Sequence, residues 1–191
     1  MYRYALAGVF LAAPLSGLAA QAADAPPKAV LVSGPREGTR APEFSLPWAS
    51  KDTVGSADSP YELWRDRGKT VVLAFYPADF TKGCTAEMQT FADQYDTLFG
   101  PDVVILGISS DSLESHRRFA ASLGLPFRLL SDTDLSVARK YASKGDAGRA
   151  KRTVFVIGPD GKVKYQNLKF NALDPQDYSA LGSAVRSARG G

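Results

Sequence analysis

Three nearly continuous apolar runs, at residues 71–76, 103–109 and 153–157, predict the buried strands of a sheet. Strands without polar alternation are typical of a sheet that is covered on both faces. A fourth run, at 162–168, alternates more and follows the turn residues 158–161, so it predicts a hairpin with the strand before it. The sheet is therefore expected to contain both parallel and antiparallel strands.

Helical spacing separates these strands. The apolar residues of 84–98 recur at helical intervals, and Gly100-Pro101 ends that pattern. Residues 111–114 have the spacing of a capping box, which predicts a helix from Asp111 to about Leu123. The other expected elements are a short strand within 38–46, a helical turn at 61–67, a strand at 127–130, a short helix at 135–141 and a last helix from 174 to about 186. Strands alternating with helices indicate an α/β fold with helices flanking a central mixed sheet.

The chain divides into three predicted parts. Residues 1–23 resemble a signal peptide, because Arg3 precedes an apolar stretch and Ala20-Gln21-Ala22 resembles a cleavage site. Residues 24–37 form a linker without periodicity, and 38–191 form one domain of a size that needs no disulfide or metal to bury a core. Export to the periplasm is therefore expected. A retained anchor is the alternative, although the apolar stretch is short for a bilayer span.

Charge and composition exclude several classes of protein. The net charge is only +3, and adjacent basic residues occur only at 117–118, 139–140 and 151–152, so no basic stripe for nucleic acid is present. One cysteine and one histidine, without paired spacing, do not predict a metal site.

The single cysteine, Cys84, lies where the strand at 71–76 passes into a helix. The first N–H groups of a helix lack internal partners, and together with the helix dipole they favour the thiolate there. An exported protein usually pairs its cysteines, so a lone one indicates either a reactive thiol or a small buried apolar residue.

Three other residues fit a reactive thiol. Thr81 can turn its hydroxyl toward the sulfur, and Pro77 can form a wall without an N–H group. Arg152 lies at a strand end from which its guanidinium could reach the pocket. Taken singly, these residues are better interpreted as a turn residue or cap, a strand terminator and a surface charge.

Three separated motifs carry a resemblance to the peroxiredoxins. Residues 76–84 read Tyr-Pro-x-x-x-Thr-x-x-Cys, which resembles the active-site signature of that family. Residues 38–46 resemble its first strand, and residues 152–161 are similar to the strand that carries its arginine. The match spans about 38–168 and is most similar to the bacterioferritin-comigratory-protein branch, so the resemblance implies a thioredoxin-like fold.

The resemblance also implies roles for individual residues. Cys84 would be the peroxidatic nucleophile, which becomes a sulfenic acid on reducing hydrogen peroxide or an organic hydroperoxide. Thr81 would form a hydrogen bond with the peroxide, Pro77 would shield the sulfenic acid, and Arg152 would stabilise the thiolate and the transition state. The backbone N–H groups of Gly83 and Cys84 would donate to the peroxide oxygens. No cofactor is implied.

The sequence departs from the family pattern at two positions. Many members of this branch have a second cysteine where this chain has Gln89, and no other cysteine replaces it. The resemblance therefore implies a one-cysteine cycle, in which an external thiol such as a thioredoxin-like protein or glutathione reduces the sulfenic acid. Lys82 stands where a proline or an apolar residue is common. A monomer and a dimer both fit the sequence.

Two other functions stay open at this stage. Thiol–disulfide exchange normally needs Cys-x-x-Cys, and Thr81 occupies the upstream position. A non-catalytic sensor or holdase could use Cys84 oxidation to change its binding to a partner.

Glu87 is expected to complement the helix dipole, and His116 to be a half-buried packing or capping residue.

Overall fold

Six strands form one mixed sheet, in the spatial order β2–β6–β5–β4–β7–β8. In chain order they are β2 (Trp48–Ala49), β4 (Thr70–Phe75), β5 (Val103–Ser109), β6 (Arg128–Ser131), β7 (Thr153–Ile157) and β8 (Val163–Asn167). β4, β5 and β6 run parallel, whereas β2, β7 and β8 are antiparallel to their neighbours. The buried strands, the closing hairpin and the mixed sheet expected from the sequence are thereby confirmed.

The structure, a computed structural model, describes residues 1–2 and 34–190. Apart from residues 1–2, the predicted signal peptide at 1–23 falls outside these residues, as does most of the predicted linker at 24–37. Among the described helices, none combines the length and the apolar character needed to cross a bilayer.

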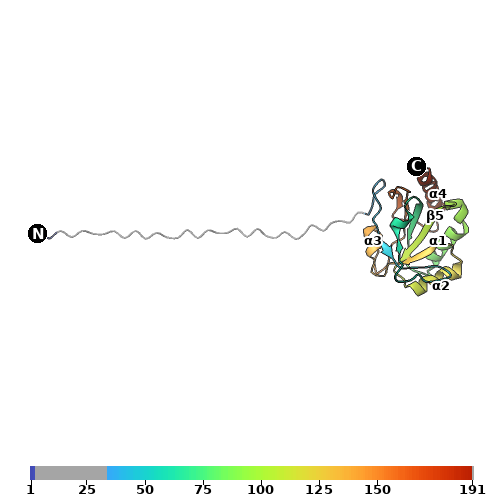
Figure 1. The fold of residues 1–191 in the computed structure, drawn as a ribbon, viewed down its shortest axis with the longest axis horizontal. Helices are drawn as coiled ribbons and strands as arrows, with labels where there is room; N and C mark the ends of the chain where they lie inside the picture. Colours follow the sequence, from blue (N-terminus) through green and yellow to red (C-terminus); the bar gives the residue numbers. More distant parts are fainter. Residues whose placement is uncertain (3–33, 191) are drawn as a thin grey trace. The chain divides into compact units, whose positions relative to one another are not determined.

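Helices cover both faces of the sheet (Figure 1). They are η1 (Leu63–Asp66, a 3₁₀ turn), α1 (Lys82–Asp93), η2 (Tyr95–Phe99, a π turn), α2 (Leu113–Leu123), α3 (Ser136–Lys140) and α4 (Pro175–Arg189). A small antiparallel pair, β1 (Ser45–Leu46) and β3 (Tyr61–Glu62), lies outside the main sheet. Figure 1 shows α3 on the side of the sheet opposite α1 and α4.

The central strand β4 divides the core into two layers. Because successive side chains of a strand point to opposite faces, Val72 and Ala74 face the layer that contains α1, α2 and α4. Leu73 and Phe75 face the other layer, beneath α3 and the β1–β3 pair. Every residue of β4 is buried, which explains its uninterrupted apolar run.

Two predicted helix boundaries are wrong. The expected helix over 84–98 ends at Asp93, and a π turn follows in which the Tyr95 hydroxyl donates to the Val103 carbonyl at 3.0 Å. Ser112, not Asp111, caps α2, since its hydroxyl accepts from the Ser115 N–H. Asp111 instead accepts a hydrogen bond from the Ser109 hydroxyl at 2.7 Å, and so belongs to the loop after β5.

Candidate active site

Cys84 lies in the first turn of α1, immediately after the loop that leaves β4, as the sequence predicts. Its side chain is fully buried, with 0% of its surface exposed. The first backbone bond of the turn runs from the Thr85 N–H to the Thr81 carbonyl at 2.8 Å. Among the described residues, the N–H groups of Gly83 and Cys84 have no hydrogen-bond partner. The turn therefore presents free donors to an anion or an oxygen beside the thiol.

Arg152 immediately precedes β7, the strand next to β4, and reaches the thiol from there. Thr153 pairs with Phe75, so the residue before it lies beside the carboxyl end of β4, where the active-site loop begins. From there the Arg152 Nη2 donates to the Cys84 Sγ at 3.3 Å. The antiparallel pairing of β7 with β4 thus brings together two residues that are far apart in the chain.

Glu87 is a member of this site that sequence reasoning assigned to another role. It was expected to complement the helix dipole, but it is fully buried and its Oε2 accepts from the Arg152 Nη1. Burial raises the pKa of Glu87 to about 7, although Arg152 opposes that rise. The carboxylate fixes the guanidinium from one side while the sulfur binds it from the other. One signal was available in the sequence, since Glu87 lies one helical turn after Cys84 and shares its face.

The other predicted site residues surround the thiol less directly. Thr81 donates its hydroxyl to the Ala78 carbonyl at 3.1 Å and makes no hydrogen bond to Cys84 within the described chain. Pro77 is partly buried in the same loop. A Cβ on Gly83 would lie 3.2 Å from the Arg152 Nη2, so the guanidinium packs against a position that glycine keeps open. The roles inferred for these residues stay predictions.

The sequence predicts a half-buried His116, but the side chain is fully buried beneath the active-site loop. Its Nδ1 lies 3.0 Å from the Oδ2 of Asp79, a residue of that loop, and its Nε2 lies 3.2 Å from the Leu130 carbonyl oxygen. The contact between His116 and Asp79 could not be predicted, because the two residues are 37 positions apart and the sequence gives no sign that Asp79 turns inward.

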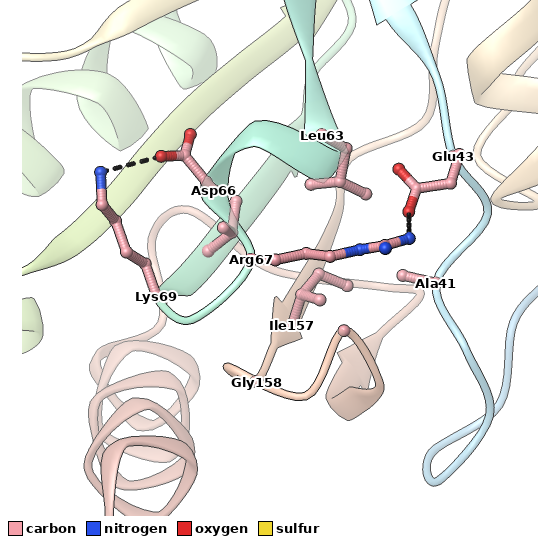
Figure 2. A pocket seen from close by; sticks show the side chains of 10 residues that line it. Ala41, Glu43, Leu63, Asp66, Arg67, Lys69, Ile157 and Gly158 are labelled. Carbon is pink, nitrogen blue, oxygen red and sulfur yellow. Dashed lines mark hydrogen bonds and ion pairs between the residues drawn. The ribbon is translucent and has the colours of Figure 1, made fainter.

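A separate pocket lies at the other end of β4 (Figure 2). The Arg67 side chain extends across it above Ile157 and pairs with Glu43 at 2.7 Å, and Lys69 pairs with Asp66 at 2.9 Å. About 10 Å³ is left, which is room for one water molecule. This pocket therefore offers no space for a substrate and lies at the sheet end opposite Cys84.

The described residues contain no cluster of three or more histidine, cysteine or acidic side chains that could hold a metal ion. The reactive group at this site is the buried Cys84 thiol, which the Arg152 guanidinium contacts. In this α/β fold, one buried thiol lies at the start of a helix and accepts a hydrogen bond from a guanidinium that is held in place. These features define a thiol-based redox protein.

Comparison with known proteins identifies which kind of thiol-based redox protein this is. Residues 38–166 match the model of the AhpC/TSA family. The chain is 34% identical over 133 residues to the peroxiredoxin Bcp of Bacillus subtilis, covering 66% of this chain and 80% of that protein. It is 36% identical over 153 residues to the chloroplastic peroxiredoxin Q of Arabidopsis thaliana, covering 79% of this chain and 67% of its relative. The chain belongs to the AhpC/TSA family, as a peroxiredoxin of the Bcp type.

Solved structures agree with this assignment. The peroxidoxin BcpB of Mycobacterium tuberculosis superposes with a TM-score of 0.69 at 28% identity, covering 81% of this chain and 99% of that one. The bacterioferritin comigratory protein of Xanthomonas campestris, studied for its alkyl peroxide reduction activity, superposes with a TM-score of 0.61 at 27% identity, covering 75% of this chain and 92% of that one. The thioredoxin-like fold is confirmed, and the protein is a thiol-dependent peroxidase.

Proposed function

We propose that this protein reduces hydrogen peroxide and small organic hydroperoxides by a one-cysteine cycle at Cys84. The contact that carries this proposal is the 3.3 Å hydrogen bond from the Arg152 Nη2 to the Cys84 Sγ. A guanidinium beside a buried sulfur favours the thiolate, which is the nucleophilic form. Because Glu87 holds the same guanidinium, the positive charge is already in place before a peroxide arrives.

In the first half of the cycle, the Cys84 thiolate attacks one peroxide oxygen in line with the O–O bond. A sulfur–oxygen bond forms, the O–O bond breaks, and the leaving oxygen departs as water or an alcohol after taking up a proton. The free N–H groups of Gly83 and Cys84 and the Arg152 guanidinium can donate to the two oxygens as charge develops on them. Cys84 is left as a sulfenic acid.

The second half of the cycle needs a thiol from outside, because the chain has one cysteine only. An external thiol attacks the sulfenic sulfur, a mixed disulfide forms and water leaves. A second external thiol then releases the reduced Cys84 and carries the disulfide away. A thioredoxin-like protein or glutathione fits this role.

A peroxide-consumption assay with several candidate thiols tests this function. The wild-type protein is expected to turn over with at least one of them, and Cys84→Ser to lose all activity. Mass spectrometry of the reduced protein after one equivalent of peroxide should show oxidation at Cys84. Oxidation no faster than that of a free thiol would reject the peroxidase function. Fast oxidation without turnover by any thiol would favour a sensor instead.

We further propose that the protein is exported to the periplasm and that the signal peptide at 1–23 is removed. The basic start, the apolar stretch and the small residues near Ala22 support this. Fractionation of expressing cells, followed by N-terminal sequencing, tests it. A mature protein that begins near Asp24 in the periplasmic fraction is expected. An intact amino terminus in the membrane fraction would instead establish a retained anchor.

A further inference from the structure

In the proposed cycle, the buried thiol of Cys84 has to react with two different molecules, a peroxide and a reducing thiol. A peroxide is small and needs the aligned donors of the closed site, whereas the reducing thiol has to bring its own sulfur to a bonding distance from Cys84. With 0% of Cys84 exposed and no second cysteine in the chain, the loop at 76–81, between β4 and α1, must move aside for that second step. The strength with which this loop is held therefore matters to both half-reactions.

One side chain of the loop, Asp79, makes most of the polar contacts that hold it. Its side chain is 1% exposed. Its Oδ1 accepts from the Tyr76 hydroxyl at 2.8 Å, and its Oδ2 accepts from the Ser115 hydroxyl at 2.7 Å. The Asp79 N–H donates to the Asp111 Oδ2 at 3.0 Å. A carboxylate buried to this degree is costly unless it is fully paired, so these contacts fix its position.

His116 connects that carboxylate to the body of the sheet. Its Nδ1 faces the Asp79 Oδ2 at 3.0 Å, and its Nε2 faces the carbonyl oxygen of Leu130 in β6 at 3.2 Å. Both neighbours are acceptors, so each ring nitrogen lies within hydrogen-bond distance of an oxygen. No surface of the His116 side chain is exposed. The loop is thus anchored through one ring to strand β6.

The closed loop also contains strain. Phe80, next to Asp79, has a φ of 57°, in the left-handed region that side chains other than glycine adopt at a cost of about 1–3 kcal/mol. Its ring is half exposed and packs against Phe119 of α2 at a centroid distance of 5.0 Å. A strained residue persists only where its surroundings hold it, so the loop would relax if the Asp79 contacts were released.

We propose that His116 is a positioning residue, which through Asp79 holds the active-site loop closed and so balances the two half-reactions. This rests on the proposed one-cysteine cycle. The closed loop favours oxidation of Cys84 by a peroxide. It opposes the attack of an external thiol on the sulfenic sulfur, the step that forms the S–S bond and releases water. Weakening the anchor therefore slows the first step and accelerates the second.

Two substitutions of similar size separate positioning from simple packing. In His116→Asn the amide nitrogen falls near the Nδ1 position and keeps a donor for Asp79, whereas in His116→Gln it falls near the Nε2 position and keeps only the donor for Leu130. We expect H116Q to lower the rate constant for Cys84 oxidation by hydrogen peroxide about tenfold, because small displacements in a reactive site have large effects on rate. The same variant should raise the rate constant for reduction of the sulfenic acid by glutathione several-fold. H116N should stay close to the wild type in both.

Ser115→Ala supplies a milder test and Ser122→Ala its control. Ser115 donates to Asp79, whereas Ser122 in the same helix donates to the Phe119 carbonyl and not to the loop. Loss of one hydrogen bond predicts changes of about two- to tenfold in S115A, in the same opposite directions, and none in S122A. Labelling of reduced Cys84 with a maleimide should be faster in H116Q and S115A than in the wild type. If H116Q does not fold, S115A still decides the matter.

The proposal is overturned if both rate constants fall together, if neither changes, or if H116N and H116Q behave alike. Each of these results would give His116 a structural role only. They are distinguishable from failure of the proposed function, in which the wild-type Cys84 itself would react with peroxide no faster than a free thiol.

Discussion

At the residue scale, the site depends on one guanidinium that has two partners at once. Arg152 binds Glu87 through Nη1 and Cys84 through Nη2, and only 18% of its side chain is exposed. A planar guanidinium can serve both partners because its nitrogens diverge in a fixed geometry. Neither partner alone would fix its orientation. The thiol is therefore paired with a charge that cannot easily turn away from it.

Arg152→Lys tests this two-partner arrangement. Lysine keeps the charge, but its single nitrogen cannot bind the acid and the sulfur together in the same geometry. We expect the rate constant for Cys84 oxidation to fall about 100- to 1,000-fold, in the range found for the loss of one fixed donor at a reacting centre. Stopped-flow measurement with hydrogen peroxide would show this. Wild-type rates in R152K would mean that charge alone suffices.

Glu87 makes stability depend on pH. Its pKa is raised from 4.5 to about 7 by burial, so between these values the folded state binds more protons than the unfolded chain. The free energy of unfolding should therefore fall as pH rises through this window, by on the order of 1–3 kcal/mol from this group. Glu87→Gln should lack that fall. Urea unfolding of both proteins near the two ends of the window measures the difference, and parallel curves would contradict the assignment.

At the element scale, the first turn of α1 is shaped for chemistry more than for helix stability. Thr81, its N-cap, makes no side-chain cap, and Gly83 in the turn is an unfavourable helix residue. What this turn gains instead is uncapped N–H groups beside Cys84 and room for a guanidinium against Gly83. Helix stability and the chemistry beside Cys84 therefore make opposite demands on the residues of this turn.

Gly83→Ala should separate these two properties. Alanine favours the helix by up to about 1 kcal/mol, so the free energy of unfolding is expected to stay unchanged or rise. Its Cβ would lie 3.2 Å from the Arg152 Nη2, so the guanidinium must shift, and Cys84 oxidation should slow. Thermal unfolding and a single-turnover assay on the same preparation measure both effects. A variant that is less stable and fully active would refute this account.

The sequence predicts this element well but not its contacts. Apolar spacing and the Cys84 position locate the strand–loop–helix unit, because β4 is buried on both faces and α1 is amphipathic. The ion-pair partners of Glu87 and His116 could not be predicted, because Arg152 and Asp79 reach them only through the folded sheet. Local pattern identifies elements, whereas a buried ion pair is defined by two elements together.

At the scale of the whole molecule, the site depends on the register of the central strands. β7 pairs with β4 so that Thr153 lies opposite Phe75, and a shift by one residue would turn Arg152 to the opposite face of the sheet. Aromatic packing on the far face helps to hold that register. Phe155 is fully buried and lies 6.1 Å from Phe75 and 5.2 Å from Tyr141, between ring centroids.

Phe155→Ala tests how much that packing contributes. Removing a buried ring typically costs about 3–5 kcal/mol, part of it from the cavity that remains. We expect a loss of this size in the free energy of unfolding, measured with urea. The rate of Cys84 oxidation at low temperature should change far less, because the ring faces away from the thiol. An equal loss of activity in fully folded protein would show that the two layers are coupled.

The separation of Cys84 and Arg152 by 68 residues also bears on how the chain acquires its activity. β4 and β5 can pair as soon as both exist, but the guanidinium arrives only when β7 adds to the other edge of β4. Contacts of such long sequence separation form late, because a large loop must be closed first. A nascent or partly folded chain thus carries an ordinary thiol. Sensitivity to peroxide appears when β7 pairs with β4, so during refolding the return of activity would date that step.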